Sequence, residues 1–563
     1  MASPASSIYN DTAAIRAAGH AIVDEAVRYL ERTGAEAAPA TVAGPPAGAS
    51  HATVAATEHL AGPPVSLAPA SLAPNTEATP RGPLPRPADI ARLFEALPPP
   101  EGAGLEAVLR RIRDDVVPNS NALADPMYMG HQVCPPLPVA ALADAVVSVL
   151  NQSQAVWEMS PAGTLLEARL IRWFASLAGY DEGAAGGSFV SGGSAATLTA
   201  LLAARAHAFP DAWRRGSPHD VAIVTGEQAH YSVSRAAGIM GIGADAVVTV
   251  PVNDAGSTDI RALSATLDSL RSQRRRVPAV VATAGSTATG AFDDLHACAD
   301  LAAQHDAWLH VDAAHGASGL LSDLVRPRLA GIERADSLAW DPHKMMFQPL
   351  STALVLVRDR RALEQAMRQE ASYLFQPATG DGSDAADARP ADQGAWTLQC
   401  SRRSDALRLW LALEYYGVNT IAELFDHCVR LTRRLHELLA DADDFEPLHA
   451  PQCNMLCFRY TGGEGGGEVG EGEGAKGVTA VTAGGGESAG ERAAAGATAK
   501  GVAAPDFQDR LRARYNASGQ GWITAATVRG QRALRVTLIN PRTEEAHLRR
   551  MMDGLRREAR ARR

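Results

Sequence analysis

The chain has 563 residues and a formal net charge of −10. This length allows more than one domain and a large buried core, and the acidic balance argues against a nucleic-acid or anionic-membrane surface. Residues 1–10 lack a basic region followed by an apolar one. The longest apolar candidate, 136–150, is interrupted by Asp144 and predicts a helix that packs in the core. We therefore expect no signal peptide and no membrane-spanning helix, which makes a cytoplasmic location the default.

The six cysteines are scattered, and none forms a Cys-x-x-Cys pair. Cys453 and Cys457 share an apolar segment, where core residues are more common than metal ligands. We predict no metal site, and the absence of a disulfide framework favours a reducing compartment.

The N-terminal part divides into three segments. Residues 11–32 show helical spacing of apolar side chains, which predicts an N-terminal helical segment over 1–32. Residues 33–87 are rich in Ala, Pro, Gly, Ser and Thr without periodicity, which is typical of a disordered insert. Helical spacing resumes near Ala88, and we predict a second helical region over 88–140.

The next segment alternates helical stretches with short β-rich runs. These runs are 187–190, 221–225, 246–250, 279–283, 308–312 and 352–357. Strands interleaved with helices predict an α/β fold whose mostly parallel sheet is covered on both faces, in a large domain over 141–400. Ligands of such sheets bind outside the carboxyl ends of the strands.

The C-terminal part is less regular. Residues 371–396 are polar and predict a mobile loop, and a helix is expected over 404–416. The region 401–563 alternates helices with two strand-like runs, 454–460 and 533–539, and predicts a small α/β domain. Within it, residues 461–504 are Gly/Glu/Ala-rich and predict a second disordered insert, without the Gly-Lys-Ser/Thr ending of a nucleotide-binding loop.

Two side chains at neighbouring strand ends indicate pyridoxal phosphate (PLP) chemistry. Lys344 lies in Asp341-Pro342-His343-Lys344-Met345-Met346, just before the run 352–357, and Asp312 ends the run 308–312. PLP needs a lysine that forms a Schiff base and a carboxylate that keeps the pyridine nitrogen protonated. An isolated lysine is usually a solvated side chain, and an isolated aspartate is often a helix cap.

Three further features follow strands in the same region. Ser191-Gly192-Gly193-Ser194 opens a helix and can bind a phosphate, although an ordinary glycine turn with a serine cap gives the same pattern. His230 can stack on a pyridine ring or be a surface histidine. The turn around Thr287 can line a cofactor edge or be a Ser/Thr-rich turn, and small Ala314 leaves room for the ring. Their common order along the chain predicts PLP binding.

The chain resembles the group II PLP-dependent amino-acid decarboxylases, which include glutamate, cysteine-sulfinate, 2,4-diaminobutyrate and aromatic amino-acid decarboxylases. The resemblance covers nearly the whole chain except the two inserts. It rests on Gly130-His131-Gln132, Asn151-Gln152-Ser153, residues 191–194, His230-Tyr231-Ser232, residues 283–292, 310–314, 341–346 and 371–376, Gln399-Cys400-Ser401-Arg402-Arg403 and Leu534-Arg535-Val536.

The resemblance implies the PLP-dependent transferase-like fold (fold type I), with a seven-stranded sheet in the large domain, and a homodimer with its active site at the interface. It also implies roles for individual residues. Lys344 would form the Schiff base, Asp312 would pair with the pyridine nitrogen and His230 would stack on the ring. The remaining implied contacts are Gly193, Ser194, Thr287, Asp341 and His343 with the cofactor, Gln132 and Arg535 with the substrate, and Tyr373 as the donor of a proton to Cα.

The substrate stays open at this point. Gln132 favours an acidic amino acid such as glutamate, aspartate or cysteine sulfinate, but a structural glutamine at a turn would give the same pattern. His131 and Asp341 each depart from an asparagine that is usual in the family. Other stretches are as similar to the diaminobutyrate branch, and an aromatic substrate is a further alternative. A fold type I aminotransferase and a non-catalytic PLP-binding regulator are the remaining rivals.

Overall fold

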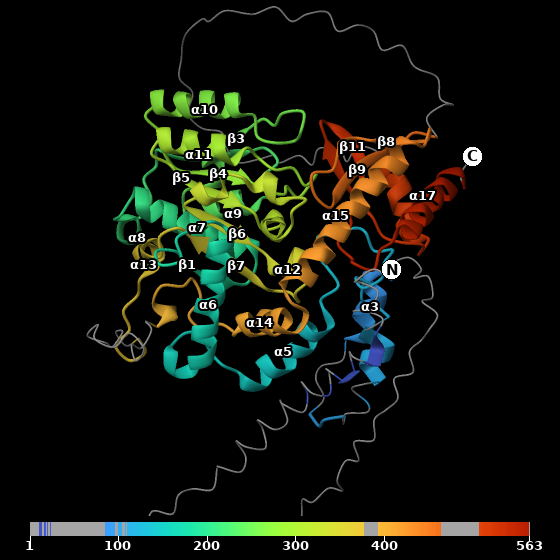
Figure 1. Ribbon diagram of the computed structural model, residues 1–563, viewed down its shortest axis with the longest axis horizontal. Coiled ribbons are helices and arrows are strands. Elements are labelled where there is room, and N and C mark those ends of the chain that lie inside the picture. The colour runs from blue at the N-terminus through green and yellow to red at the C-terminus, as the bar shows by residue number, and fades with distance from the viewer. Residues whose placement is uncertain are drawn as a thin grey trace, which may run out of the picture.

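The computed structural model describes residues 118–375, 392–462 and 506–561, together with parts of 11–23 and 85–116. The two segments predicted to be disordered, 33–87 and 461–504, fall outside the described residues except at their ends. Most of the predicted loop over 371–396 also falls outside them. Figure 1 shows the large domain around its sheet and the C-terminal elements packed beside it.

A seven-stranded sheet forms the centre of the large domain, in the order β1-β7-β6-β5-β4-β2-β3. Of these seven strands only β7 runs antiparallel to its neighbours, β1 and β6. The predicted seven-stranded, mostly parallel sheet is therefore confirmed. The strands are β1 (Gly186–Val190), β2 (Val221–Gly226), β3 (Val247–Val250), β4 (Arg276–Thr283), β5 (Trp308–Asp312), β6 (Ser337–Trp340) and β7 (Ala353–Val357).

Helices cover both faces of this sheet, which explains why its central strands are continuous apolar runs. All residues of β2, β5 and β7 are buried. Adjacent residues point to opposite faces, so Val224 packs in one hydrophobic cluster and Ile223 in another. One face carries α7 (Gly193–Ala208), α9 (Ser232–Ile239) and α13 (Arg361–Met367); the other carries α6 (Pro161–Leu177), α10 (Ile260–Ser272) and α11 (Leu295–Gln304).

The helix boundaries follow local sequence signals. α5 (Pro138–Leu150) begins with a proline and ends at Asn151, whose φ of 46° is left-handed. The Asp259 side chain caps α10 by accepting hydrogen bonds from two backbone N–H groups. The helices predicted over 136–150 and 404–416 are confirmed as α5 and α14 (Asp405–Tyr416). The short helices are α3 (Pro87–Leu93), α8 (Ala212–Arg215) and α12 (Pro342–Met345).

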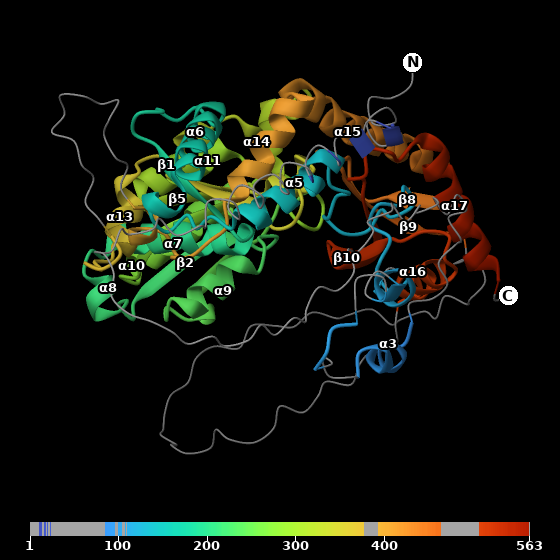
Figure 2. The same ribbon diagram turned by 90° about the horizontal axis from the view of Figure 1, so that it is seen from below.

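The C-terminal part forms an antiparallel sheet in the order β10-β11-β9-β8. Helices pack on it around a separate hydrophobic core that includes Leu435, Phe458, Leu534 and Met551. Figure 2 shows these elements beside the large domain. The elements are β8 (Phe445–Pro447), β9 (Met455–Tyr460), β10 (Thr524–Val528), β11 (Gln531–Thr537), α15 (Val418–Ala440), α16 (Phe507–Ala517) and α17 (Glu545–Arg560).

One segment from the predicted N-terminal region joins this smaller sheet. The N–H group of Met129 donates to the Trp522 carbonyl at 2.8 Å, and the N–H group of Thr537 donates to the Met129 carbonyl at 2.9 Å. Met127 and Met129 also pack in the smaller core. This packing places Gly130 and the residues after it beside β11, whereas the predicted domain boundaries themselves stay predictions.

Candidate active site

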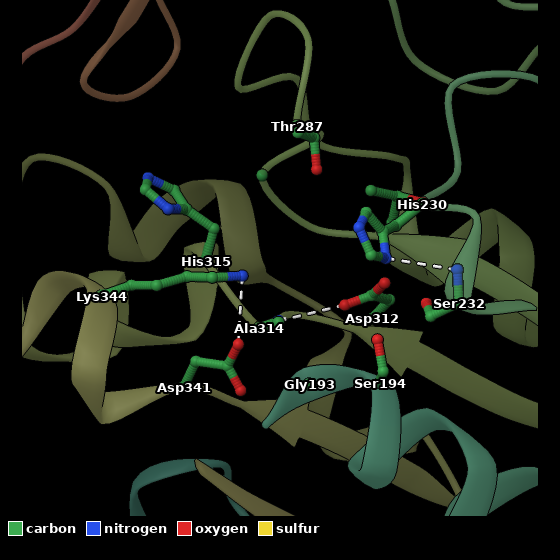
Figure 3. Close-up of a pocket in the computed structure, with 12 residues that line it drawn as sticks. Gly193, Ser194, His230, Ser232, Thr287, Asp312, Ala314, His315, Asp341 and Lys344 are labelled. Atoms are coloured by element: carbon green, nitrogen blue, oxygen red, sulfur yellow. Dashed lines mark hydrogen bonds and ion pairs between the residues drawn. The ribbon is translucent and has the colours of Figure 1, made fainter. Parts of the chain in front are cut away.

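A polar cavity of about 110 Å³ lies at the carboxyl edge of the large sheet. Its walls come from the loops that follow several strands, as the rule for parallel sheets predicts. Figure 3 shows that side chains of Lys344, Asp312 and His230 converge there. The lining residues are Gly193, Ser194, His230, Ser232, Thr283, Gly285, Thr287, Asp312, Ala314, His315, Asp341 and Lys344.

The glycine loop forms one wall of the cavity. β1 ends at Val190 and α7 begins at Gly193, without a side chain capping the free N–H groups of its first turn. A Cβ atom at Gly193 would lie 2.8 Å from Asp341 Oδ2 and 3.1 Å from the Ala314 Cβ. Glycine is therefore required at Gly193, and the partial positive charge of this helix terminus faces the cavity.

Asp312 lies at the end of β5, and its side chain is buried. Its Oδ1 accepts a hydrogen bond from the Ala314 N–H group at 3.3 Å. The short Ala314 side chain leaves open space on this side of the cavity. The arrangement presents a carboxylate to a flat ligand, which suits a protonated ring nitrogen.

Lys344 projects into the cavity from α12. Its Nζ lies 3.1 Å from Asp341 Oδ2, and its side chain is 18% exposed. The Nδ1–H group of His343 donates to the Thr352 carbonyl at 2.7 Å, while its Nε2 lies 3.6 Å from Asp341 Oδ2. Burial lowers the pKa of His343, so Lys344 provides the positive charge beside Asp341.

Lys344 is also the one lysine in the described part of an arginine-rich chain. The whole sequence holds three lysines, Lys344, Lys476 and Lys500, against 50 arginines. Arginine supplies positive charge equally well, but its guanidinium does not lose a proton and attack a carbonyl carbon. The retention of a lysine at this position therefore favours a covalent role, and the scarcity of lysine is visible in the sequence alone.

His230 stands on the opposite side of the cavity from Lys344. Its Nδ1 accepts a hydrogen bond from the Ser232 N–H group at 3.2 Å, so its Nε2 carries the ring proton. Burial lowers the pKa of His230, partly opposed by the negative charge of Asp312. The ring is therefore neutral at pH 7, as stacking on a flat ligand requires.

The cavity contains buried polar atoms that have no partner among the described residues. They are Ser232 Oγ, Thr283 Oγ1, His315 Nδ1 and Asp341 Oδ1. Buried polar atoms are nearly always hydrogen-bonded, so four such atoms around one cavity indicate that a polar ligand completes it. PLP fits these groups: the N-terminus of α7 suits its phosphate, the Lys344 amine its aldehyde, the Asp312 carboxylate its ring nitrogen, and the neutral His230 ring its flat face.

Arg535 and Gln132 meet next to the cavity. Arg535 is 6% exposed, and its guanidinium donates to the Thr287 carbonyl at 2.6 Å and to the Gly130 carbonyl at 3.2 Å. Both Arg535 and Gln132 contact Met455 Sδ, at 3.2 and 3.5 Å. Burial lowers the pKa of Arg535, and the described residues place no carboxylate against it. Such a buried cation is suited to an anionic ligand.

The family model of the pyridoxal-dependent decarboxylase conserved domain matches residues 87–461. The chain belongs to the pyridoxal-dependent decarboxylases. This decarboxylase is 34% identical to an L-2,4-diaminobutyrate decarboxylase of Acinetobacter baumannii, over 64% of this chain and 72% of the relative. It is also 34% identical to the L-aspartate decarboxylase dtxS4 of Metarhizium robertsii, over 68% of this chain and 75% of the relative.

Solved structures agree with this assignment. The crystal structure of mouse CSAD matches with a TM-score of 0.72 and 26% identity, covering 85% of this chain and 93% of the other. The glutamate decarboxylase domain of diaminobutyrate-pyruvate transaminase and L-2,4-diaminobutyrate decarboxylase from Vibrio parahaemolyticus matches with a TM-score of 0.69 and 25% identity, covering 86% of this chain and 91% of the other. Fold type I and PLP as cofactor are therefore confirmed for this decarboxylase, which is an amino-acid decarboxylase.

Most of the predicted site residues gather in the decarboxylase cavity. Gly193, Ser194, His230, Thr287, Asp312, Ala314, Asp341 and Lys344 line it, and His343 adjoins it through Asp341. Arg535 and Gln132 lie behind the Thr287 carbonyl rather than in the lining. Tyr373 is apart from the cavity lining: it is 88% exposed, next to residues 376–391, which are not described. The individual roles of all these residues stay predictions.

Four lining residues had no predicted role: Ser232, Thr283, Gly285 and His315. Thr283 ends a strand, and each of the other three lies within two residues of a residue with a predicted role, so position along the chain could have indicated all four. For His315 the signal was stronger, because it stands three residues after Asp312 in a run of otherwise small residues.

Proposed function

We propose that this decarboxylase converts an acidic L-amino acid (glutamate, aspartate or cysteine sulfinate) into the corresponding amine and CO₂. The observation that carries the proposal is Gln132, whose amide contacts the same Met455 sulfur as Arg535, a buried cation that the described residues leave without a carboxylate. Arg535 suits the α-carboxylate that every amino acid carries, and the Gln132 amide next to it offers hydrogen-bond donors to the second acidic group that only an acidic amino acid carries. The geometry thus supports a pocket built for negative charge.

The two carboxylates that line the cavity already have assigned partners. Asp341 contacts Lys344, and Asp312 is reserved for the ring nitrogen. No third carboxylate lines this cavity among the described residues. A diamine would therefore find no free counter-charge there, which favours an acidic substrate over 2,4-diaminobutyrate. The similarity to diaminobutyrate decarboxylases keeps that amino acid as the second candidate.

The cofactor roles are proposed residue by residue. When bound, PLP supplies an electron sink for the electron pair of the broken Cα–carboxylate bond. Lys344 holds it covalently, and the N-terminus of α7 at Gly193 and Ser194 holds its phosphate with His343. Asp312 keeps the ring nitrogen protonated, and His230 and Ala314 enclose the ring from its two faces. Thr287 and Asp341 are proposed as the remaining contacts of the cavity lining with the cofactor.

The substrate roles follow from the position of Arg535. Its guanidinium, held by three backbone carbonyls and the Thr524 hydroxyl, fixes the direction of the α-carboxylate relative to the cavity. The bond to be broken must stand perpendicular to the cofactor ring, and a rigid arginine can set that angle. Gln132 contacts the distal acidic group. Burial of the site excludes water and strengthens these charge interactions.

Tyr373 is proposed to deliver a proton to Cα after CO₂ has left. Its high exposure, outside the cavity lining, is what we expect of a residue that acts across a subunit interface. We propose a homodimer whose active site lies at that interface. Large apolar side chains are also exposed elsewhere among the described residues, including Leu350, and a partner subunit could cover them.

Tyr373→Phe should change the product rather than the affinity for substrate. Without the hydroxyl, the proton would be added to the cofactor carbon that is bonded to the substrate nitrogen instead of to Cα. Hydrolysis would then release an aldehyde instead of an amine. We expect the aldehyde-to-amine ratio to rise at least about tenfold, with progressive loss of activity as the cofactor is consumed. Chromatographic quantification of both products measures this ratio, and a variant that releases only amine would exclude the proposed role.

Arg535→Gln should weaken the use of substrate while the cofactor is retained. Losing one member of a buried charge pair typically costs 2–5 kcal/mol, so kcat/KM should fall by about 10²- to 10³-fold. Arg532→Gln is the matched control on the same strand, because its guanidinium pairs with Asp509 away from the cavity. Equal kinetic losses in both variants would contradict the assigned role of Arg535.

The substrate proposal is tested by a CO₂-release assay with the purified holoenzyme. Glutamate, aspartate and cysteine sulfinate are compared with 2,4-diaminobutyrate and an aromatic amino acid at equal concentration. We expect an acidic amino acid to have a kcat/KM at least about tenfold above the others. A higher value for diaminobutyrate or the aromatic amino acid would overturn the substrate proposal and leave the decarboxylase assignment intact.

A cytoplasmic location is part of the same proposal. None of the six cysteines forms a disulfide, as expected in a reducing compartment. In the described part of the chain, no helix has the length and apolar character needed to cross a membrane.

A further inference from the structure

His315 is a titratable side chain in the cavity that the proposed roles do not use. It is 2% exposed, and its ring lies on the Lys344 side of the cavity. Its Nδ1 is buried and has no partner among the described residues. A buried acceptor left unsatisfied destabilises the protein by about 1–3 kcal/mol. A ligand that donates a hydrogen bond would remove that cost.

The protonation of the His315 ring is set by Asn454. His315 Nε2 lies 2.6 Å from Asn454 Oδ1, and the Asn454 Nδ2 donates to the Leu538 carbonyl at 3.1 Å. Because the amide nitrogen is engaged there, the amide oxygen faces the histidine and only accepts. Nε2 must therefore carry the proton, and Nδ1 presents a lone pair.

The ring stays neutral over the physiological pH range. Burial, together with the positive charges of Lys344 and Arg535, lowers the pKa of His315 to about 3, while the Asn454 hydrogen bond opposes the shift. These groups belong to α12, β11 and the start of β9, the elements that face the ring. His315 is thus a permanent hydrogen-bond acceptor rather than a base in the free enzyme.

The same few residues connect His315 to the proposed carboxylate site. Asn454, which orients His315, is followed by Met455, whose Sδ lies 3.2 Å from Arg535 Nη2. Two consecutive residues at the start of β9, Asn454 just before it and Met455 within it, therefore contact both the acceptor, His315, and the cation, Arg535. An acceptor and a cation are what the two charged groups of an amino-acid head require: the ammonium donates and the carboxylate accepts.

We propose that His315 Nδ1 accepts a hydrogen bond from the α-ammonium group of the incoming amino acid while Arg535 binds its α-carboxylate. The inference rests on the proposed function and adds a residue that positions the substrate nitrogen beside Lys344, which that nitrogen must displace. The side chain of an acidic substrate has only acceptor groups when ionised, so it cannot satisfy Nδ1. The α-ammonium group can, and every amino-acid substrate carries one.

The test measures binding without turnover. Borohydride reduction of the holoenzyme fixes the cofactor to Lys344, so an added amino acid can bind but cannot react. Calorimetric titrations compare L-aspartate with succinate and L-glutamate with glutarate, which share both carboxylates but differ in the amine. We expect the amino acids to bind at least about tenfold more tightly, and His315→Phe to abolish this preference while leaving dicarboxylate binding unchanged. A preference that survives in His315→Phe overturns the inference.

Two further variants separate this role from a structural one. In His315→Gln the amide oxygen still accepts, and we expect part of the preference to return. In Asn454→Asp the new carboxylate raises the pKa of His315, so the ring gains a proton as pH falls and repels the ammonium. Amino-acid binding should then weaken towards acidic pH, whereas the unsubstituted protein shows no such change from His315. An Asn454→Asp variant whose affinity for the amino acid does not change with pH would contradict the inference.

This experiment distinguishes failure of the inference from failure of the proposed function. If acidic amino acids release CO₂ but His315→Phe keeps the amine preference, the inference is wrong and the proposed function stands. If no acidic amino acid releases CO₂ but another amino acid does, the proposed function is wrong. The same comparison between that amino acid and its deaminated analogue then decides the role of His315.

Discussion

Lys344→Ala protein should fold normally and lose about 10⁴- to 10⁶-fold of its decarboxylation rate, the scale seen when a covalent catalytic residue is removed. The Nζ atom is the one primary amine that a described side chain places in the cavity. Alanine removes the covalent attachment of the cofactor and leaves Asp341 without its contact at 3.1 Å. Both changes act at the centre of the site.

The measurement combines a CO₂-release assay with reductive labelling. Borohydride treatment of the holoenzyme should place one cofactor on the tryptic peptide that contains position 344, and none on that peptide in Lys344→Ala. Because the other two lysines, Lys476 and Lys500, lie far along the chain, mass spectrometry separates the three positions. Label at Lys476 or Lys500 with none at Lys344 would contradict the assignment.

Asp312→Asn should lower the rate by about 10²- to 10³-fold while the cofactor stays attached to Lys344. The amide has nearly the same shape and keeps an oxygen for the Ala314 N–H group, but it carries no negative charge. A neutral amide does not stabilise the protonated form of the ring nitrogen, so the cofactor would be a weaker electron sink. The effect therefore falls on the chemical step rather than on folding.

Single-turnover kinetics provide the measurement for Asp312→Asn, because they isolate the chemical step from binding and release. Asp323→Asn is the control, since this carboxylate is exposed and outside the cavity. The thermal unfolding midpoints of both variants should match that of the unsubstituted protein within a few degrees. An Asp312→Asn variant with an unchanged single-turnover rate would exclude the proposed partner of the ring nitrogen.

The part of the site that lies at strand ends could be predicted from the sequence. Asp312 ends an apolar run and the loop at Gly193 follows one, and parallel strands bring such positions to one edge of a sheet. Lys344 was placed by its motif and by the run 352–357 after it, because the strand before it, β6, was not predicted. Short strands were harder to find. β6, β8 and β10 were missed. β8 has only three residues and ends in a proline, while β6 (Ser-Leu-Ala-Trp) and β10 (Thr-Ala-Ala-Thr-Val) contain too few large apolar residues to give a usable periodicity.

Residues contributed by the smaller domain could not be placed from the sequence. Arg535 reaches Thr287 and Gly130 through contacts between segments more than 240 residues apart, and no local pattern encodes such a contact. The packing of residues 127–130 on the smaller sheet is equally non-local. The neutral state of His315 depends on the orientation of the Asn454 amide, which only the folded contacts define.

The central claim is that this chain removes the α-carboxylate of an acidic amino acid with PLP, and a mass balance tests it most directly. Purified holoenzyme is incubated with glutamate, aspartate or cysteine sulfinate, and CO₂, amine and keto acid are quantified together. We predict one CO₂ and one amine for each amino acid consumed, with no keto acid. Keto acid formed without CO₂ would identify an aminotransferase and contradict the account.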